Sequence, residues 1–267
     1  MARSLTQHIV HDCADPWLDK GYDALNQYFG VRGEMETRAV IEQRLGWRPD
    51  TPIDGYALRY EMVILADADG AIAAVRDHCV VLALDAIRVG VQAAVVHLSH
   101  IWIDPRWQGQ QLTRQLHDAP ILAARAALAR AALPTTTAII LAAEVEPYQA
   151  DDRERIGRLR AFQRAQYRPA DPERIPFVQP DFRVPAVIDA SGGPQPLALI
   201  LMLWRVGREY EPETTAGEIR HIVHCLYAMY GHGMDPRHMQ AAYDTLAAYP
   251  PDTATVRLSW DTVFKPA

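Results

Sequence analysis

Two residues that could transfer a proton lie two positions apart in an apolar segment near the middle of the chain. His97 and Ser99 interrupt residues 95–103, which are otherwise mostly hydrophobic. Side chains two residues apart on a β-strand point to the same face, so the imidazole and the hydroxyl should face one site. An unperturbed imidazole titrates near pH ~6.5 and accepts a proton at neutral pH. The strand therefore carries a group that can accept a proton; a core histidine bonded to a backbone carbonyl is the alternative role for His97.

The residues after this strand contain the parts of an anion-binding site. A short turn at Asp104 and Pro105 leads into residues 107–113, where a long helical pattern begins. The first N–H groups of a helix have no partner inside the helix, and the helix dipole is positive at that end. A strand, a tight loop and a helix start in this order can hold a pyrophosphate.

Hydrophobic periodicity predicts the elements that position this segment. Before the central strand we expect helices over residues 16–29 and 35–45 and strands over residues 60–66 and 71–84. After it we expect a helix over residues 112–133 with a kink at Pro120, a strand over 138–143, a helix over 151–165, a proline-rich extended segment over 167–196 with one short strand near Phe177, a strand over 197–206, helices over 215–230 and 236–246, and a last strand over 256–261. This order predicts a mixed α/β fold.

Composition and charge exclude several classes of protein. The 267 residues suffice for one enlarged domain or for a domain with an appendage. A net charge of −6 predicts no broad cationic surface for nucleic acid or anionic lipid. Three distant cysteines predict no disulfide framework, and the longest apolar run, residues 197–204, is too short to span a membrane. The first residues lack the apolar core of a signal peptide, so we expect a soluble, cytoplasmic protein.

Residues 103–113 resemble the acyl-CoA loop of the GNAT superfamily of N-acetyltransferases. Those proteins carry Gln/Arg-x-x-Gly-x-Gly/Ala between a hydrophobic strand and a helix, and Gln108 fills the first position here. Gln111 stands where the family has Gly, and Thr113 where it has Gly or Ala. The likeness spans about residues 15–206. It implies a mostly antiparallel central sheet flanked by helices in a domain of residues 1–206, with residues 207–267 as a helix-helix-strand extension packed on it.

The resemblance also implies transfer of an acetyl group from acetyl-CoA to a primary amine of a small molecule or a peptide. The family often places a carboxylate base eleven residues before the Gln/Arg, and His97 occupies that position. The resemblance therefore implies that His97 is the general base, with Ser99 holding a water. Phe162 stands where the family has the Tyr that protonates the departing thiolate. The alternative is a catalytically degenerate protein of this fold that senses CoA or binds another protein. The implied catalytic residues are His97, Ser99 and Glu144, and those implied at the cofactor are Ile101, Trp102, Ile103, Gln108, Gly109, Gln110, Gln111, Leu112, Thr113 and Phe162.

Charged residues in two other predicted strands have two open interpretations each. Arg76, Asp77 and His78 interrupt an apolar strand, with Asp77 on the face opposite the other two. They either bind the substrate in the acceptor cleft or form the polar face of an edge strand. Glu144 and Glu146 end a strand, where they either have a function, binding a cationic acceptor or contacting the base, or are simply solvated.

The remaining histidines give weaker predictions. His221 and His224 share a helix face beside Cys225, but no carboxylate or cysteine pair completes a zinc site, and no metal is predicted. His100 should point away from His97 and be structural. Apolar strands near the C-terminus permit a homodimer.

Overall fold

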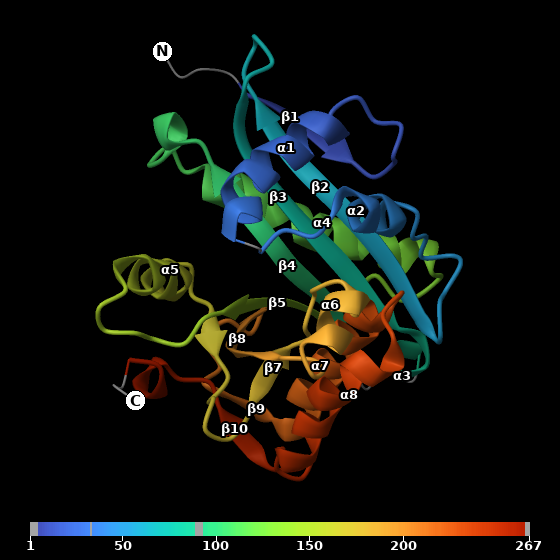
Figure 1. Ribbon diagram of the computed structural model, residues 1–267, viewed down its shortest axis with the longest axis vertical. Coiled ribbons are helices and arrows are strands. Elements are labelled where there is room, and N and C mark those ends of the chain that lie inside the picture. The colour runs from blue at the N-terminus through green and yellow to red at the C-terminus, as the bar shows by residue number, and fades with distance from the viewer. Residues whose placement is uncertain (1–4, 33, 89–92, 265–267) are drawn as a thin grey trace. The chain divides into compact units, whose positions relative to one another are not determined.

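The protein was analysed as a computed structural model that describes residues 5–32, 34–88 and 93–264 (Figure 1). The chain forms two compact units, Met1–Ile139 and Ile140–Ala267, and each is described by itself. The domain boundary that the resemblance implies, between residues 206 and 207, stays a prediction. Among the described residues, no helix combines the length and the hydrophobicity needed to cross a lipid bilayer.

Four antiparallel strands form the sheet of the first unit. In spatial order they are β1 (Thr6–Val10), β2 (Tyr56–Ala66), β3 (Ile72–Ala83) and β4 (Ala94–Ile103). The turn between β2 and β3 contains Gly70 with a φ of 76°, a conformation that glycine adopts without a steric penalty. Strands β2 and β3 are buried along most of their length, which explains why their sequences are almost continuously apolar.

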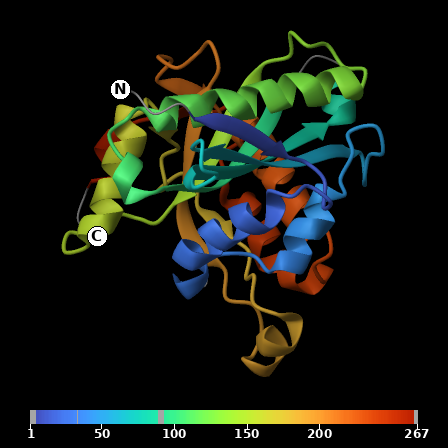
Figure 2. The same ribbon diagram turned by 90° about the horizontal axis from the view of Figure 1, so that it is seen from above.

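Helices cover both faces of this sheet (Figure 2). They are α1 (Leu18–Phe29), the 3-10 turn η1 (Gly30–Arg32) and α2 (Arg38–Leu45) on one face, and α4 (Leu112–Arg130) on the other. The short helices α3 (Leu84–Arg88) and η2 (Pro105–Trp107) follow β3 and β4. Helix α4 buries Leu112 and Leu116 against Val63 and Leu65 of β2. This face of α4 is the apolar stripe that the sequence predicts.

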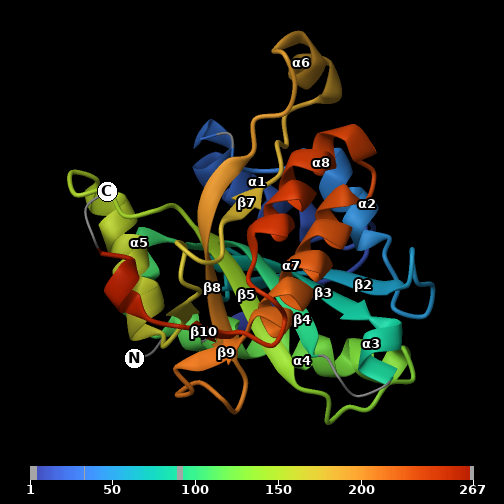
Figure 3. The same ribbon diagram turned by 90° about the horizontal axis from the view of Figure 1, so that it is seen from below.

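The second unit is built around strand β8 (Leu197–Arg205). Its partners are all antiparallel: β5 (Ile139–Val145), β6 (Arg168–Pro169) and β7 (Phe177–Gln179). A separate pair consists of β9 (Glu213–Thr215) and β10 (Thr255–Arg257). The helices are α5 (Arg153–Arg164), α6 (Pro185–Ala190), α7 (Ala216–Gly231) and α8 (Pro236–Thr245), with 3-10 turns η3 (Leu246–Ala248) and η4 (Trp260–Thr262). Figure 3 shows α7 beside α8, and α6 in the loop that joins β7 to β8.

The predicted fold class, a mixed α/β fold with a mostly antiparallel sheet flanked by helices, is confirmed. All six predicted helices are present. Strand β1 is missing from the prediction, because its short segment mixes polar and apolar residues. The extended segment at residues 167–196 is wrong in part: it contains α6, since Pro185 occupies the first helical position, where a missing N–H costs nothing. The last predicted strand ends early, at Arg257.

A glycine in α1 permits the close approach of that helix to the sheet, and its substitution should destabilise the protein. A Cβ at Gly21 would collide with the fully buried side chains of Met62 and Ile64. Gly21→Ala should therefore lower the free energy of unfolding by about 1–3 kcal/mol, the usual effect of overpacking. The control is Gly157→Ala in α5, where a Cβ meets nothing within 4 Å. It should raise stability by up to about 1 kcal/mol through helix propensity. Equal effects of the two changes on denaturant unfolding would contradict this account of the packing.

Candidate functional site

An irregularity in the pairing of β3 with β4 decides which side chains face α1. The register shifts at Asp77, which lies opposite two residues of β4, Ser99 and His100. His97 pairs with Cys79, two residues beyond Asp77, so these three side chains share one face. The His100 ring contacts the Asp77 carboxylate and therefore lies on this face as well. The prediction that His100 points away from His97 is wrong, because strict alternation fails at a bulge.

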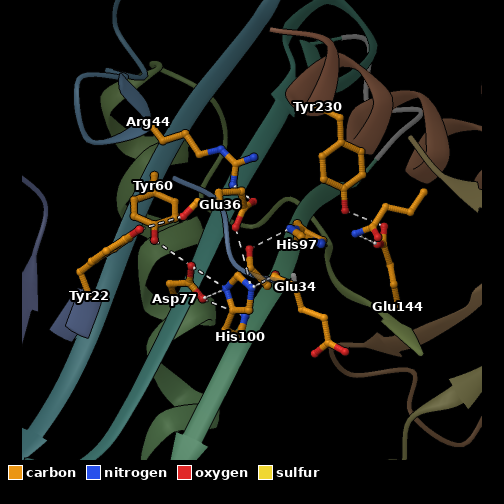
Figure 4. Close-up of polar contacts among 12 residues, drawn as sticks. Tyr22, Glu34, Glu36, Arg44, Tyr60, Asp77, His97, His100, Glu144 and Tyr230 are labelled. Atoms are coloured by element: carbon orange, nitrogen blue, oxygen red, sulfur yellow. Dashed lines mark hydrogen bonds and ion pairs between the residues drawn. The ribbon is translucent and has the colours of Figure 1, made fainter. Parts of the chain in front are cut away.

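Asp77 is the centre of a buried network of hydrogen bonds on this face (Figure 4). Its carboxylate accepts hydrogen bonds of 2.7 Å from the Tyr60 hydroxyl and from the backbone N–H of His100. The His100 ring lies 3.1 Å from the same carboxylate through Nδ1. Through Nε2 the ring lies 2.9 Å from the backbone carbonyl oxygen of Glu34. One side chain of β3 thus joins β2, β4 and the segment before α2.

Two ion pairs give the network balanced charges. Burial opposes the ionisation of Asp77, but His100 and the hydrogen bond from Tyr60 outweigh it and hold the pKa of Asp77 at about 2. Burial likewise opposes the charge on His100, yet Asp77 and then Glu36 raise the pKa of His100 to about 9. Arg44 donates to Glu36 at 2.5 Å and, against the effect of burial, keeps the pKa of Glu36 below its ordinary value. The site therefore contains a buried imidazolium beside a buried carboxylate.

His97 and Ser99 lie side by side, as predicted. Ser99 Oγ is 3.1 Å from His97 Nδ1, and His97 is only 5% exposed. Burial, followed by the charge of Arg44, lowers the pKa of His97 to about 3. The expected titration near pH 6.5 is therefore wrong for the folded protein. The ring is neutral over the physiological range and accepts a proton as a weak base.

Arg76 and His78 lie on the opposite face of β3, toward α4. Arg76 pairs across the strands with Ile101, which packs on the apolar cluster under α4. His78 lies 3.7 Å from Glu61, which also binds Arg59. The exposed fractions of Arg76, Asp77 and His78 are 6%, 0% and 0%. Side chains buried this deeply offer almost no surface to a dissolved acceptor. No observation tests their role in substrate binding, which stays a prediction.

The base of the loop between β4 and α4 is firmly anchored. Asp104 N–H donates to the Ala73 carbonyl oxygen at 3.0 Å, and the Asp104 carboxylate accepts from Arg106 N–H at 2.8 Å. The Arg106 guanidinium also binds this carboxylate. Trp107 is 4% exposed and packs in the cluster beneath α4. These contacts fix the position from which residues 108–111 extend to the start of α4.

The tip of this loop has two left-handed residues immediately before α4. Gly109 has a φ of 78°, and Gln111 has a φ of 61° and a ψ of 20°. Gln111 thus adopts the backbone conformation that favours glycine, at the position where the GNAT motif has one. Within the part of the chain that the structure describes, nothing accepts a hydrogen bond from the backbone N–H groups of residues 109–113. These donors lie at the positive end of a 19-residue helix, where an anion is favoured. The role of the loop in binding a cofactor stays a prediction.

In the second unit, Glu144 is held in one orientation by two donors. Its carboxylate accepts a hydrogen bond of 2.7 Å from the Tyr230 hydroxyl and one of 3.2 Å from the Gln179 amide (Figure 4). Glu146, at the end of the same strand, pairs with Arg158 at 2.6 Å. The catalytic role of Glu144 stays a prediction.

The other predicted positions are also in the second unit. Phe162 packs edge-on against Tyr167, with ring centroids 5.1 Å apart. His221 Nε2 lies 3.7 Å from Cys225 Sγ on α7. Among residues 5–32, 34–88 and 93–264, no group of three or more His, Cys, Asp or Glu side chains is arranged to hold a metal ion. The role of Phe162 at a cofactor stays a prediction.

Sequence reasoning missed the partners of the predicted residues: Tyr60, Glu36 and Arg44 in the first unit, and Gln179 and Tyr230 in the second. Counting back from the turn around Gly70 does not find Tyr60. The register of the β2–β3 hairpin shifts by one residue between Leu65 and Ala66, and without that shift Tyr60 would lie opposite His78, on the face away from Asp77. The others come from segments far apart in sequence, whose contacts only the folded chain reveals.

Comparison with known proteins gives distant similarities only. No protein-family model matches the chain, and no curated protein matches it. Matching solved structures include a tandem GNAT protein from the clavulanic acid biosynthesis pathway (16% identity, TM-score 0.44, 66% of this chain and 46% of that one), a variant of the spermidine N-acetyltransferase SpeG from Vibrio cholerae (12%, 0.41, 78% and 96%) and Arabidopsis thaliana NAA60 in complex with acetyl-CoA (10%, 0.44, 76% and 99%).

These matches include proteins of the superfamily that residues 103–113 resemble. This chain spans less than half the length of the tandem protein. At identities of 10–16% and TM-scores of 0.41–0.44, the likeness carries no argument about activity or substrate. The proposals about activity and substrate rest on the geometry of the site instead.

The left-handed conformation of Gly109 should be needed for binding CoA. Gly109→Val would strain a residue with a φ of 78°, although a Cβ there meets nothing within 4 Å. We expect the loop to distort and so relieve the strain of this valine's backbone conformation. If recovering the binding conformation costs about 1.4 kcal/mol, the Kd for acetyl-CoA in calorimetric titration should rise roughly tenfold. Gly55→Val is the matched control, because Gly55 has a φ of 83° and equally open surroundings but precedes β2. Equal affinities in the two folded variants would rule out the loop as the binding site.

Replacing Gln111 tests whether its side chain or its backbone matters. Gln111→Gly should retain or increase the affinity for acetyl-CoA, since glycine adopts the left-handed conformation without strain. Stability should change by less than about 1 kcal/mol, because relief of strain is offset by the greater freedom of glycine in the unfolded chain. A tenfold loss of affinity in titration would instead make the Gln111 side chain a direct ligand.

Proposed function

We propose that this protein is an acyl-CoA-dependent N-acyltransferase that moves an acetyl group from acetyl-CoA to a primary amine of a small molecule or a peptide. The observation that carries the proposal is the loop that ends β4. Two left-handed residues precede α4, and the N–H groups of residues 109–113 have no acceptor among the described residues; this loop follows directly after the strand that bears His97 and Ser99. A single strand thus supplies a phosphate site at its end and a proton acceptor along its length.

The donor set of the loop fits a diphosphate. The N–H groups of residues 109–113 are directed by the backbone and do not ionise, and residues 108–111 are exposed. The negative charge of Asp104 is neutralised by Arg106, so it does not repel an anion. Arg114, exposed in the first turn of α4, adds positive charge. In this proposal Ile101, Trp102 and Ile103, at the end of β4, lie beside the acyl arm of the CoA molecule.

The proposed reaction forms a C–N bond and breaks a C–S bond. The amine must be neutral to attack the thioester carbonyl, and its nitrogen becomes strongly acidic as the new bond forms. His97, although a weak base, can accept a proton from such a nitrogen, directly or through a water held by Ser99. The CoA thiolate leaves and takes a proton from water, because Phe162 offers no acidic group.

A second candidate function is a protein of this fold that binds CoA, or another protein, without catalysis. The 5% exposure of His97 favours this second function, because so little exposure is what a structural histidine of the core would have. Titration with acetyl-CoA, followed by assays of thiol release with a panel of amines, separates the two functions. Binding without turnover of any amine would support the second, and absence of binding would exclude the first.

His97→Gln tests the proposed base. The variant should lower kcat/KM by roughly 10²–10⁴-fold, the usual contribution of a positioned base, while the Kd for acetyl-CoA stays unchanged. In the wild type, His97 should produce no inflection in kcat/KM between pH 5 and 8, because its pKa of about 3 lies below this range. Activity should rise with pH only as the amine substrate loses its proton. Full activity of His97→Gln would end the assignment of His97 as base.

A further inference from the structure

We propose that His100 is a positioning residue: a buried imidazolium that holds residues 34–36 on the central strand and so fixes one wall of the path by which the acceptor reaches His97. The role in acceptor binding rests on the proposed function, whereas the clamp itself does not. Nothing in the sequence pattern assigned this role, because His100 was expected on the other face.

The geometry of the ring requires two protons. Nδ1 faces the Asp77 carboxylate at 3.1 Å, and Nε2 faces the carbonyl oxygen of Glu34 at 2.9 Å. Both partners are acceptors only, and neither can donate a hydrogen bond. A neutral imidazole carries one N–H, so one of its nitrogens would present a lone pair to an oxygen. Only the imidazolium donates to both.

The surroundings stabilise this charge. Asp77 is fully buried and ionised, and Glu36 Oε2 lies 3.8 Å from Nε2. The pKa of His100, raised to about 9 against the effect of burial, agrees with the hydrogen bonds. The titratable and charged groups that face this cluster are Tyr22 on α1, Glu36 before α2, Arg44 on α2, Tyr60 on β2, Asp77 and Cys79 on β3 and His97 on β4.

The clamp is one of several contacts on this segment, since the backbone N–H of Glu34 also donates to the Phe29 carbonyl oxygen at 3.1 Å. Residues 34–36 connect η1 to α2, over the face that carries His97 and Ser99. The side-chain contacts of this segment include those of His100, of the Tyr22 hydroxyl on the Glu36 carbonyl oxygen (3.2 Å) and of Arg44 on the Glu36 carboxylate. Loss of the charge would place a ring lone pair against a carbonyl or carboxylate oxygen and would loosen the Glu34 end of the segment. The affinity for the acceptor would then fall, while the diphosphate loop, which follows β4 and has its own anchors at Asp104 and Trp107, would be unaffected.

The direction of the pH dependence follows from the raised pKa. An unperturbed imidazole loses its proton near pH ~6.5, whereas His100 in the folded chain keeps it to about pH 9. The stabilisation from His100 is therefore fully present below about pH 6.5 and is lost as the pH rises through about 9.

The first test is the protonation state of His100 in the wild-type protein at pH 7. Long-range ¹H–¹⁵N correlation spectra distinguish an imidazolium from either neutral tautomer, and both ring nitrogens should be protonated. A neutral His100 at pH 7 would overturn the proposal. This measurement needs no variant and no catalytic activity.

The second test compares two variants of the network at pH 7. Asp77→Asn keeps the shape but removes the carboxylate charge, so His100 should become neutral and the amides of residues 34–36 should exchange with deuterium at least tenfold faster. Tyr60→Phe removes a hydrogen bond from the same carboxylate but leaves its charge. It should retain the imidazolium and the slow exchange. Equal exchange in Asp77→Asn and wild type would refute the clamp.

With an acceptor amine in hand, Asp77→Asn should raise its KM about tenfold with little change in kcat and none in the Kd for acetyl-CoA. A fall in kcat with KM unchanged would contradict the positioning role. If no amine is acetylated, the proposed function fails, and the spectra and the exchange rates still decide the clamp. If Asp77→Asn does not fold, faster exchange of residues 34–36 above pH 9 in the wild type, corrected for the intrinsic rate, supports the clamp, and its absence overturns it.

Discussion

A carboxylate without access to water is the constraint on which the first unit depends. Asp77 lies in the middle of β3 with an exposed fraction of 0%, and a buried charge is tolerated only when it is paired and hydrogen-bonded. Tyr60 supplies one donor from β2, and His100 supplies a backbone and a ring donor from β4. The bulge that brings His100 onto this face is therefore also the feature that satisfies Asp77. In turn, the charge of the imidazolium draws residues 34–36 over the sheet, so the arrangement of α1, α2 and three strands is coupled to one ionised group.

The sequence predicts the parts of the site that follow from periodicity within one element. His97 and Ser99 share a face because they lie two residues apart on β4, and the strand–loop–helix order places the N-terminus of α4 at the end of that strand. The orientation of His100 could not be predicted in this way, since a bulge is a property of two paired strands and neither strand shows it alone. The lowered pKa of His97 could not be predicted from the sequence either, because it results mainly from burial, and burial depends on helices remote in sequence.

The difference between patterns within one element and contacts between elements also explains which parts of the fold could be predicted. Most helices and the long strands follow from regular patterns of apolar residues, because burying one face of each is the main source of their stability. Short elements such as β1 and α6 have too few residues to show a period, and they are determined by tertiary contacts instead. The contacts of Glu144 likewise depend on tertiary structure. Tyr230 on α7 and Gln179 on β7 donate to its carboxylate, and the residue spacing within β5 predicts neither of them.

The loop before α4 has a consequence for how such a site changes over evolutionary time. Its shape is set by the anchors Asp104 and Trp107 and by the left-handed turns at Gly109 and Gln111, while its donors are backbone amides that every residue except proline possesses. In the proposed function, anion binding therefore depends on the conformation of the loop more than on the identity of the side chains at its tip. A glutamine can replace a glycine there if the anchors hold the backbone in place. Sites of this kind can lose their sequence motif while they retain their chemistry.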